Sequence, residues 1–383
     1  MKNVENNAKL IHNDKGEYPL SSGQKGLWFL HQINPLSARY NVPVTFKITN
    51  DLELTDLEKL LNVFINRHTL MHSGFYLRNG QPIRKILTKA RINLDRVDVS
   101  LLSYKELCQN IKKQTESAFD LQQAPLLRAS VLDGYKSSRI LLLVFHHLVF
   151  DGASLKLLID ELNLIHQAIN AETTDLPALA FDFHDYTEWQ QQWLRSEDSQ
   201  PSQQFWLQQL AGEIPRLQLP LKKNGTAQET IRGEVKKFAV SSHIREKFQQ
   251  LATEHKCSEF LLWLMAYFAF LSRYTLQKDI IIGNPYMGRA DSRFDKIIGF
   301  FANIAPIRCQ FNQPESFLQL LNRNKDNVYN SLFHGDYPIE ELISQLQLPN
   351  QKADELLFQT AFVWTQAAEI NKIENNSLGL EVL

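Results

Sequence analysis

The chain has 383 residues, of which 44% are hydrophobic and 22% are charged. This length is sufficient for two domains, because single hydrophobic cores seldom grow beyond about 250 to 300 residues. Its 41 Lys and Arg residues against 42 Asp and Glu residues give a formal net charge of −1, so the basic excess that attracts a nucleic-acid backbone or an anionic membrane is missing.

The cysteines and the apolar segments indicate the cellular compartment in which the protein is expected. Cys108, Cys257 and Cys309 are odd in number and far apart, which argues against both a disulfide framework and a zinc site. The first 18 residues lack the apolar core of a secretory signal, and the most apolar run, residues 260–271, is too short to span a bilayer. We therefore expect a cytoplasmic protein with no metal site, no membrane partner and no nucleic-acid partner.

Residues 20–169 alternate between strand and helix patterns. Thr55 and Glu58 have capping-box spacing, which predicts the start of a helix, and Asn79–Gly80 predicts a hairpin turn. The expected elements are an apolar cluster around Trp28, strands at 42–48, 126–132 and 139–146, a hairpin within 74–86, a turn at 133–134, and helices at 55–68, 104–119 and 153–169.

The pattern loosens at 170–177, which suggests a boundary between two halves, 1–175 and 176–383. The order of strands and helices recurs loosely in the second half, although no residue pattern repeats, so we expect an α+β fold. The expected elements of this half are helices at 181–193, 202–210, 258–274 and 314–332, a helix from about residue 242, strands at 231–240, 304–309 and 357–364, and a short parallel-type strand at 279–283.

The stretch at 141–154, LLLVFHHLVFDGAS, carries the strongest chemical signal. Its apolar run is typical of a strand buried on both faces. Successive side chains of a strand point to opposite faces, so at most one of His146 and His147 can face a given site. An isolated buried histidine is most often a hydrogen-bonded core residue. The position of this pair at a strand end, just before an Asp-Gly turn, favours a chemical role for one of them.

The turn at Asp151–Gly152 supplies the other parts of an acyl-transfer site. Gly152 allows a ligand to approach the backbone closely, and the following helix offers N–H donors to a developing negative charge. A base and oxyanion donors are what acyl transfer requires. Asp151 can orient the histidine or pair with an arginine elsewhere. The G-x-S-x-G, P-loop, G-x-G-x-x-G and H-E-x-x-H motifs are missing from the sequence, which argues against other common chemistries.

HHLVFDG at 146–152 resembles the HHxxxDG motif of the acyltransferase superfamily that includes chloramphenicol acetyltransferase and the condensation domains of nonribosomal peptide synthetases. Further stretches resemble other condensation-domain motifs in the same order along the chain. They are SSGQKGLWFL (21–30), RHTLMHSGF (67–75), FHDYTEW (183–189), IGFFANIAPIR (298–308) and HGDYPIE (334–340), together with the loop GNPYMGR (283–289).

This resemblance implies distinct roles for the two histidines. His147 would face a tunnel and would accept a proton from the acceptor amine or position that amine, while His146 would be structural. Gly152 would donate its backbone N–H near the thioester oxygen. The product would be an amide on the acceptor arm and a free thiol on the donor arm.

The resemblance also implies roles for more distant residues. Asp151 would pair with Arg289 and hold the geometry of the site, and Asn303 would lie close to the tunnel. The implied fold is a V-shaped pseudo-dimer of two chloramphenicol acetyltransferase-like halves, 1–175 and 176–383. The implied partners are donor and acceptor peptidyl carrier proteins, whose phosphopantetheine arms enter the tunnel, and an adjacent adenylation domain. We expect a monomer that binds no cofactor directly.

Some motifs depart from the family pattern. Gly26 stands where the first motif usually has an arginine, and KADELLF (352–358) alone represents the seventh motif. Family members continue through further strands, so we expect the C-terminal half to be truncated. Epimerization domains resemble EGHGRE near the loop at 283–289, where this chain has GNPYMGR, and this difference favours a condensation domain. Heterocyclization domains replace the histidines by aspartate, which is not seen in this sequence. A stand-alone acyltransferase acting on a free amine or alcohol, and an inactive truncated scaffold domain, remain the alternative functions.

Overall fold

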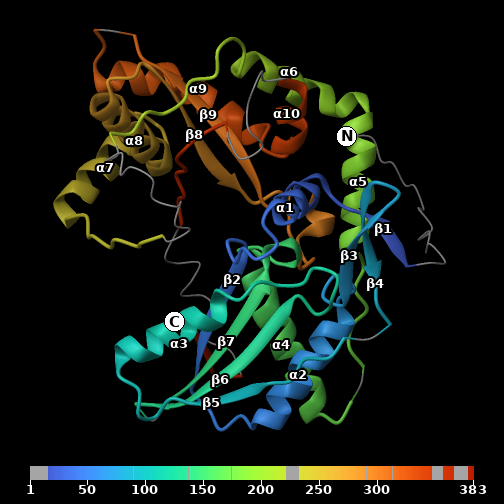
Figure 1. The fold of residues 1–383 in the computed structure, drawn as a ribbon. Coiled ribbons are helices and arrows are strands. Elements are labelled where there is room, and N and C mark those ends of the chain that lie inside the picture. The colour runs from blue at the N-terminus through green and yellow to red at the C-terminus, as the bar shows by residue number, and fades with distance from the viewer. Residues whose placement is uncertain are drawn as a thin grey trace. The chain divides into compact units, whose positions relative to one another are not determined.

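The computed structural model describes residues 16–220, 233–346, 357–365 and 378–383, apart from residues 89, 137, 174, 290 and 313. The chain forms two compact units with a mixed α/β architecture (Figure 1). Unit 1 comprises Met1–Gln192, Asp291–Phe300 and Ala367–Leu383, and unit 2 comprises Trp193–Ala290 and Phe301–Gln366.

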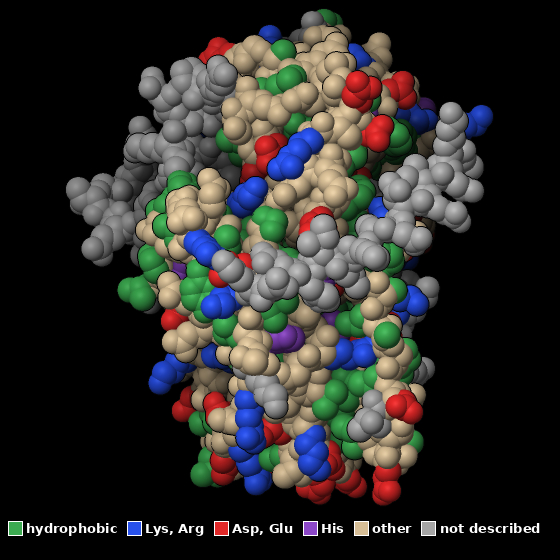
Figure 2. All heavy atoms as spheres, turned by 90° about the vertical axis from the view of Figure 1, so that its right-hand side faces the viewer, with side chains coloured by type: hydrophobic (Ala, Val, Ile, Leu, Met, Phe, Trp, Pro, Cys, Tyr) green, Lys and Arg blue, Asp and Glu red, His purple; other side chains and the backbone are tan. Residues whose placement is uncertain are grey.

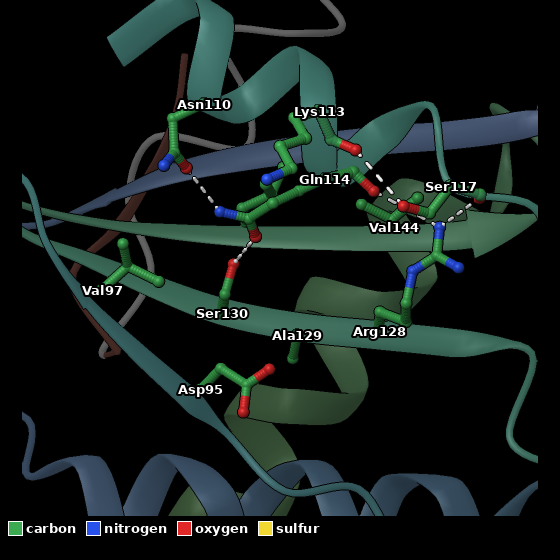
Figure 3. A pocket seen from close by; sticks show the side chains of 11 residues that line it. Asp95, Val97, Asn110, Lys113, Gln114, Ser117, Arg128, Ala129, Ser130 and Val144 are labelled. Atoms are coloured by element: carbon green, nitrogen blue, oxygen red, sulfur yellow. Dashed lines mark hydrogen bonds between the residues drawn. The ribbon is translucent and has the colours of Figure 1, made fainter. Parts of the chain in front are cut away.

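The main sheet of unit 1 has the strand order β10-β2-β7-β6-β5. Strands β2, β6 and β7 pair antiparallel, and β5 runs parallel to β6. Helix α3 lies over one face, while α2 and α4, which pack on each other, lie over the other (Figures 1 and 3). The elements are β2 (Asn41–Ile48), α2 (Leu54–Arg67), β5 (Asp95–Asp98), α3 (Tyr104–Thr115), β6 (Leu127–Tyr135), β7 (Ser138–His146), α4 (Ser154–Asn170) and β10 (Leu380–Val382).

Strand β7 is covered on both faces, which explains its continuous apolar sequence. Leu142 and Val144 are buried on the side of α3, because they share a cavity with α3 residues. Side chains alternate along a strand, so Leu141, Leu143 and Phe145, all fully buried, face α2 and α4. The predicted strand at 139–146 and the predicted helix at 153–169 are therefore confirmed within one residue at each end.

A second sheet of unit 1 has the order β1-β4-β3. The predicted hairpin is confirmed, because Arg78 pairs with Gln81 across a two-residue turn in which Asn79 and Gly80 have φ of 50° and 75°. These left-handed conformations suit Asn-Gly. The elements are β1 (Glu17–Pro19), α1 (Ser22–Ile33), β3 (Ser73–Arg78) and β4 (Gln81–Ile86), with α5 (Phe183–Arg195) reaching the boundary of the unit.

Unit 2 is built on the antiparallel pair β8-β9, which is buried on both faces. Ile280 and Ile282 of β8 pack in a cluster with α8 and α9, whereas Ile281 packs in another cluster with α6 and α10. The elements are α6 (Gln200–Gln209), α7 (Ser242–Glu254), α8 (Glu259–Thr275), β8 (Asp279–Tyr286), β9 (Asn303–Gln310), α9 (Phe317–Phe333) and α10 (Ile339–Leu346).

Two predicted strands of the second half are not formed as expected. In the strand predicted at 231–240, the described residues 233–240 are exposed and belong to no sheet, while residues 231 and 232 lie outside the described part. In the strand predicted at 357–364, an isolated parallel bridge joins Ala361 to Gly283. A strand needs a continuous ladder partner to satisfy its backbone, and periodicity alone does not reveal one.

Three local predictions were also wrong. The capping box at Thr55 is not formed, because Glu58 instead accepts a hydrogen bond from the Leu94 N–H, and α2 starts without a side-chain cap. The turn predicted at 133–134 is an irregularity within β6, where Gly134 has φ of 94°. The strand at 279–283 extends to Tyr286 and pairs antiparallel with β9. Residues 352–356 of the KADELLF motif lie outside the described part.

Candidate active site

The two motif histidines lie where β7 ends and the chain changes conformation. His146 is the last strand residue, and His147 begins the 3-10 turn η1 (His147–Val149). The backbone of Tyr40 accepts a hydrogen bond from the His147 N–H at 2.8 Å, and the Gln24 side chain donates to the carbonyl of Leu148 at 2.9 Å. The histidines therefore differ in environment because the strand stops between them, and not through regular strand alternation.

His146 is a buried, neutral histidine. Its side chain is 1% exposed, and its Nδ1 accepts a hydrogen bond from the Leu148 N–H at 3.1 Å. Burial, and to a smaller extent the neighbouring His31, His147 and Arg128, lower the pKa of His146 to about 3. A ring that accepts at Nδ1 and stays uncharged is a structural component of the core.

His147 is partly exposed and is held in one tautomer. Its Nδ1 lies 2.7 Å from the carbonyl oxygen of Phe150. A carbonyl oxygen only accepts hydrogen bonds, so Nδ1 carries a proton, and in the neutral ring Nε2 keeps its lone pair. Among the described residues, none forms a hydrogen bond with Nε2. The Phe300 ring meets the His147 ring edge to face, with centroids 4.9 Å apart. His147 thus has the tautomer that can accept a proton at Nε2.

Asp151 fixes the turn that precedes α4. It is 2% exposed, and its Oδ1 accepts hydrogen bonds from the backbone N–H of Ser154 at 2.9 Å and from the Ser154 hydroxyl at 2.7 Å. These bonds resemble those of a helix N-cap. The His147 ring is oriented by the Phe150 carbonyl, whereas Asp151 organises the backbone that follows.

Gly152 borders open space. The residue is exposed, and a Cβ atom built on it would have no heavy atom within 4 Å. No hydrogen bond between described residues uses its N–H group. A ligand can therefore approach this backbone without displacing a side chain, at the N-terminal end of α4 where N–H dipoles favour negative charge.

The other two predicted site residues lie in unit 2. The Arg289 guanidinium lies 4.2 Å above the centroid of the Phe301 ring. Before it, Gly288 has φ of +65°, and a Cβ there would lie 1.8 Å from the Phe301 carbonyl oxygen, so only glycine fits. Asp151 belongs to unit 1, and its pairing with Arg289 stays a prediction.

Asn303 joins the start of β9 to the chain before α10. Its amide nitrogen donates to the carbonyls of Gly335 at 2.8 Å and Tyr337 at 2.7 Å, and its side-chain oxygen accepts from the Ile339 N–H at 3.1 Å. These three bonds use the side chain to hold backbone, which is a structural role. Its proximity to a tunnel stays a prediction.

Four residues of this region were not singled out in the sequence. Ser154 and Phe300 touch the motif residues directly, Gln24 holds the 3-10 turn, and Arg128 acts on the pKa of His146. The HHxxxDG pattern ends at Gly152, so it does not include any of them. A serine at the start of the amphipathic helix α4, directly after the Asp-Gly turn, is the signal that could have identified Ser154.

A cavity of about 350 Å³ lies between α3 and the sheet of unit 1 (Figure 3). Its central polar groups bond to one another: Ser130 donates to Gln114 at 2.6 Å, and Gln114 donates to Asn110 at 2.7 Å. Arg128 donates to the backbone carbonyl of Ser117 at 2.7 Å, beyond the C-terminal end of α3. These bonds attach α3 to the sheet and keep Arg128 near His146.

Several surface and whole-chain properties complete the description. On the face drawn in Figure 2, basic and acidic side chains are interspersed. None of the helices that the structure describes is both long and apolar enough to cross a bilayer. Within the described ranges, no three His, Cys, Asp or Glu side chains are grouped so as to hold a metal ion.

Comparison with known proteins agrees with this fold and motif. The condensation domain family matches residues 14–381, and the chain belongs to this family. It is 31% identical over 351 residues to malpinin synthetase of Mortierella alpina and 30% identical over 345 residues to gramicidin S synthase 2 of Brevibacillus brevis. These alignments cover 91% and 90% of the chain but only 4% and 8% of the relatives.

Solved structures share the fold at lower identity. A four-domain nonribosomal peptide synthetase has a TM-score of 0.81 at 20% identity, over 94% of this chain and 27% of that chain. The first condensation domain of the calcium-dependent antibiotic synthetase has a TM-score of 0.73 at 18% identity, over 91% of this chain and 79% of that chain. The X-domain from teicoplanin biosynthesis has a TM-score of 0.81 at 22% identity, over 90% and 76% of the two chains.

Proposed function

We propose that this chain is a condensation domain of a nonribosomal peptide synthetase that joins a carrier-bound acyl or peptidyl thioester to a carrier-bound aminoacyl group. The observation that carries this proposal is the hydrogen bond from His147 Nδ1 to the Phe150 carbonyl, because it leaves Nε2 as a proton acceptor. Family membership and the synthetases among the relatives support the same reaction.

The reaction needs an amine nucleophile, a proton acceptor and stabilisation of the carbonyl oxygen. The acceptor amine attacks the donor thioester carbonyl, so that a C–N bond forms and the C–S bond breaks. His147 Nε2 takes the proton that leaves the amine and returns a proton to the departing thiolate. A neutral amine is already nucleophilic, so holding it near the carbonyl is a contribution separate from proton transfer.

Gly152 and the start of α4 serve the carbonyl oxygen in this mechanism. The Gly152 N–H has no bonding partner among the described residues and lies at a helix N-terminus, where partial positive charge favours a developing oxyanion. The open space beside Gly152 admits the thioester. Asp151 holds this turn through Ser154, and Arg289 is its proposed ionic partner.

Partners and finer organisation follow from the same proposal. Phosphopantetheine arms of donor and acceptor carrier proteins present the two substrates, and an adenylation domain is a further partner within a synthetase. We propose two acetyltransferase-like halves, 1–175 and 176–383, and a monomeric chain. The solved holo synthetase in complex with AMP and glycine is an example of a fold relative that works beside other domains.

The test is amide formation by the purified chain with a loaded donor carrier and a loaded acceptor carrier, followed by intact-protein mass spectrometry. We expect the acyl mass to move to the acceptor carrier in the wild type and not in His147→Ala. Acylation of a free amine or alcohol without the acceptor carrier would instead indicate a stand-alone acyltransferase.

A docking role is the second candidate. The solved complex of the X-domain with OxyB shows a fold relative bound to another protein, with a TM-score of 0.80 at 21% identity. Likeness at this identity concerns the fold alone. The fixed tautomer of His147 favours catalysis, and absence of transfer between any loaded carriers would favour docking.

A further inference from the structure

Ser154 connects the Asp151 carboxylate to a distant stretch of the chain. It is completely buried at the start of α4. Its Oγ lies 2.7 Å from Asp151 Oδ1, accepts a hydrogen bond from the Gly299 N–H at 3.1 Å, and lies 3.1 Å from the Gly299 carbonyl oxygen. A hydroxyl has one proton, and a carboxylate is the stronger acceptor, so the proton is donated to Asp151.

Gly299 is followed by Phe300, the residue whose ring packs against His147. The stretch 291–300 is part of unit 1, although the residues on both sides of it belong to unit 2. Near its start, the Phe294 ring packs against Tyr186 and Trp189 of α5. Ser154 secures the other end by hydrogen bonds.

Two contacts restrict the His147 ring. The hydrogen bond to the Phe150 carbonyl sets the direction of Nδ1. The Phe300 ring, packed edge to face against the His147 ring, limits the rotation of that ring about the hydrogen bond. The position of Phe300 in turn depends on the backbone at Gly299, which Ser154 holds. A chain of direct contacts therefore runs from Ser154 to His147.

We infer that Ser154 is a positioning residue for amide synthesis: by holding Gly299 it keeps Phe300 against His147 and so keeps Nε2 in one orientation toward the acceptor amine. This inference rests on the proposed function. Ser154 is fully buried and acts through Phe300, so it touches neither substrate nor the reacting atoms.

The hydroxyl is the part of Ser154 that this role requires. In Ser154→Ala, the Gly299 N–H loses the Ser154 hydroxyl as its acceptor, and Asp151 Oδ1 loses the hydroxyl as a donor. A buried group that loses its hydrogen-bond partner favours a shift of the backbone. Ser154→Thr keeps the hydroxyl. Ser103→Ala is a matched control, because Ser103 caps α3 of the same unit through the Glu106 N–H without contacting the candidate site.

The first measurement is the single-turnover rate of amide formation at saturating loaded carriers. Misplacing a reacting group by about 1 Å can lower a rate by about 100-fold, and we expect a loss of about 10- to 100-fold in Ser154→Ala. We expect Ser154→Thr to recover most of the rate and Ser103→Ala to keep it. An unchanged rate in Ser154→Ala would overturn the inference.

The second measurement needs no substrate and applies equally if Ser154→Thr fails to fold. In protein with ¹⁵N-labelled histidines, the Nδ1–H signal of His147 is assigned by its loss in His147→Ala. We expect this signal to shift or broaden in Ser154→Ala and to stay unchanged in Ser103→Ala. An unchanged signal in Ser154→Ala overturns the inference even if the rate falls. If the wild type forms no amide, the proposed function fails, and the NMR comparison still decides whether Ser154 positions His147.

Discussion

The Nδ1 atom of His147 lies 2.7 Å from the carbonyl oxygen of Phe150, three residues further along the chain. Both atoms belong to the short turn that joins β7 to α4. The turn therefore determines the tautomer of His147 locally, and it leaves Nε2 as the nitrogen with a lone pair. Replacing His147 should therefore affect mainly the rate of amide formation, whereas replacing His146 should affect mainly the stability of the protein.

His147→Ala should lower amide formation by about 10²- to 10⁴-fold, the usual contribution of a positioned proton acceptor. Because the side chain is only partly buried, its free energy of unfolding should change by less than about 1 kcal/mol. Carrier-to-carrier transfer and denaturant unfolding measure the two quantities. A variant that keeps the wild-type rate would remove His147 from the mechanism.

His146→Ala should mainly lower the stability of the protein. Removing a ring that is 1% exposed and that accepts the Leu148 N–H leaves a cavity and an unpaired buried donor, so we expect a loss of about 2 to 4 kcal/mol in the free energy of unfolding. Urea unfolding of the purified variant measures this loss. Wild-type stability would show that the buried ring is not a structural component.

The stability of unit 1 should fall on acidification because of His146. Burial lowers the pKa of this residue from 6.5 to about 3 in the folded protein. Between these pH values the unfolded chain binds a proton that the folded chain does not, so stability decreases as pH falls, by up to about 1.4 kcal/mol per pH unit.

The comparison of wild type with His146→Leu isolates this contribution. The loss of unfolding free energy between pH 7 and pH 5 should be smaller in the variant by about 2 kcal/mol, as measured by urea unfolding at both pH values. Equal losses in the two proteins would contradict the lowered pKa.

Gly152 and Gly288 differ in the space that a side chain at each position would occupy. Gly152→Ala should fold with wild-type stability, because its Cβ would meet no atom within 4 Å, yet it should slow amide formation if the thioester passes this backbone. Gly288→Ala should lose about 3 kcal/mol or more, because its Cβ would collide with the Phe301 carbonyl at φ of +65°. Thermal unfolding and single-turnover rates distinguish the two. An unaffected rate in Gly152→Ala would place the thioester elsewhere.

The proposed pairing of Asp151 with Arg289 is open to a double-mutant cycle. If the two charges pair in a buried setting, Asp151→Asn and Arg289→Gln should each lower the free energy of unfolding by about 3 to 5 kcal/mol. The double variant should lose less than the sum, with a coupling of about 0.5 to 3 kcal/mol. Fully additive losses would show that the residues do not interact.

Local signals predicted the elements that depend on local sequence. The Asn79–Gly80 hairpin, the buried strand β7 and the amphipathic helix α4 follow from turn chemistry and apolar periodicity. The three-residue strands β1 and β10 were not predicted, because such short strands exist only through pairing with β4 and β2. The exposed segment at 233–240 shows the reverse error, since an alternating pattern occurs there without a ladder.

The residues of the candidate site show the same difference between local and long-range signals. The HHxxxDG motif singled out His147, Asp151 and Gly152 as candidates, because they lie within six residues of one another in the sequence. The contact of Ser154 with Gly299 joins residues that are 145 positions apart, and no spacing rule predicts such a pair. The interaction of Asp151 with the His147 ring was left open by the sequence, and the structure orients that ring through Phe150 instead.

Unit 1 is assembled from three separate lengths of chain. A gene fragment that stops at the end of α5 would omit Phe300, which packs on His147, and β10, which extends the main sheet beside β2. Exchange of this region between synthetases by a single crossover would therefore combine a histidine from one parent with a neighbouring ring from the other. Chimeras that transplant all three lengths together avoid this mismatch.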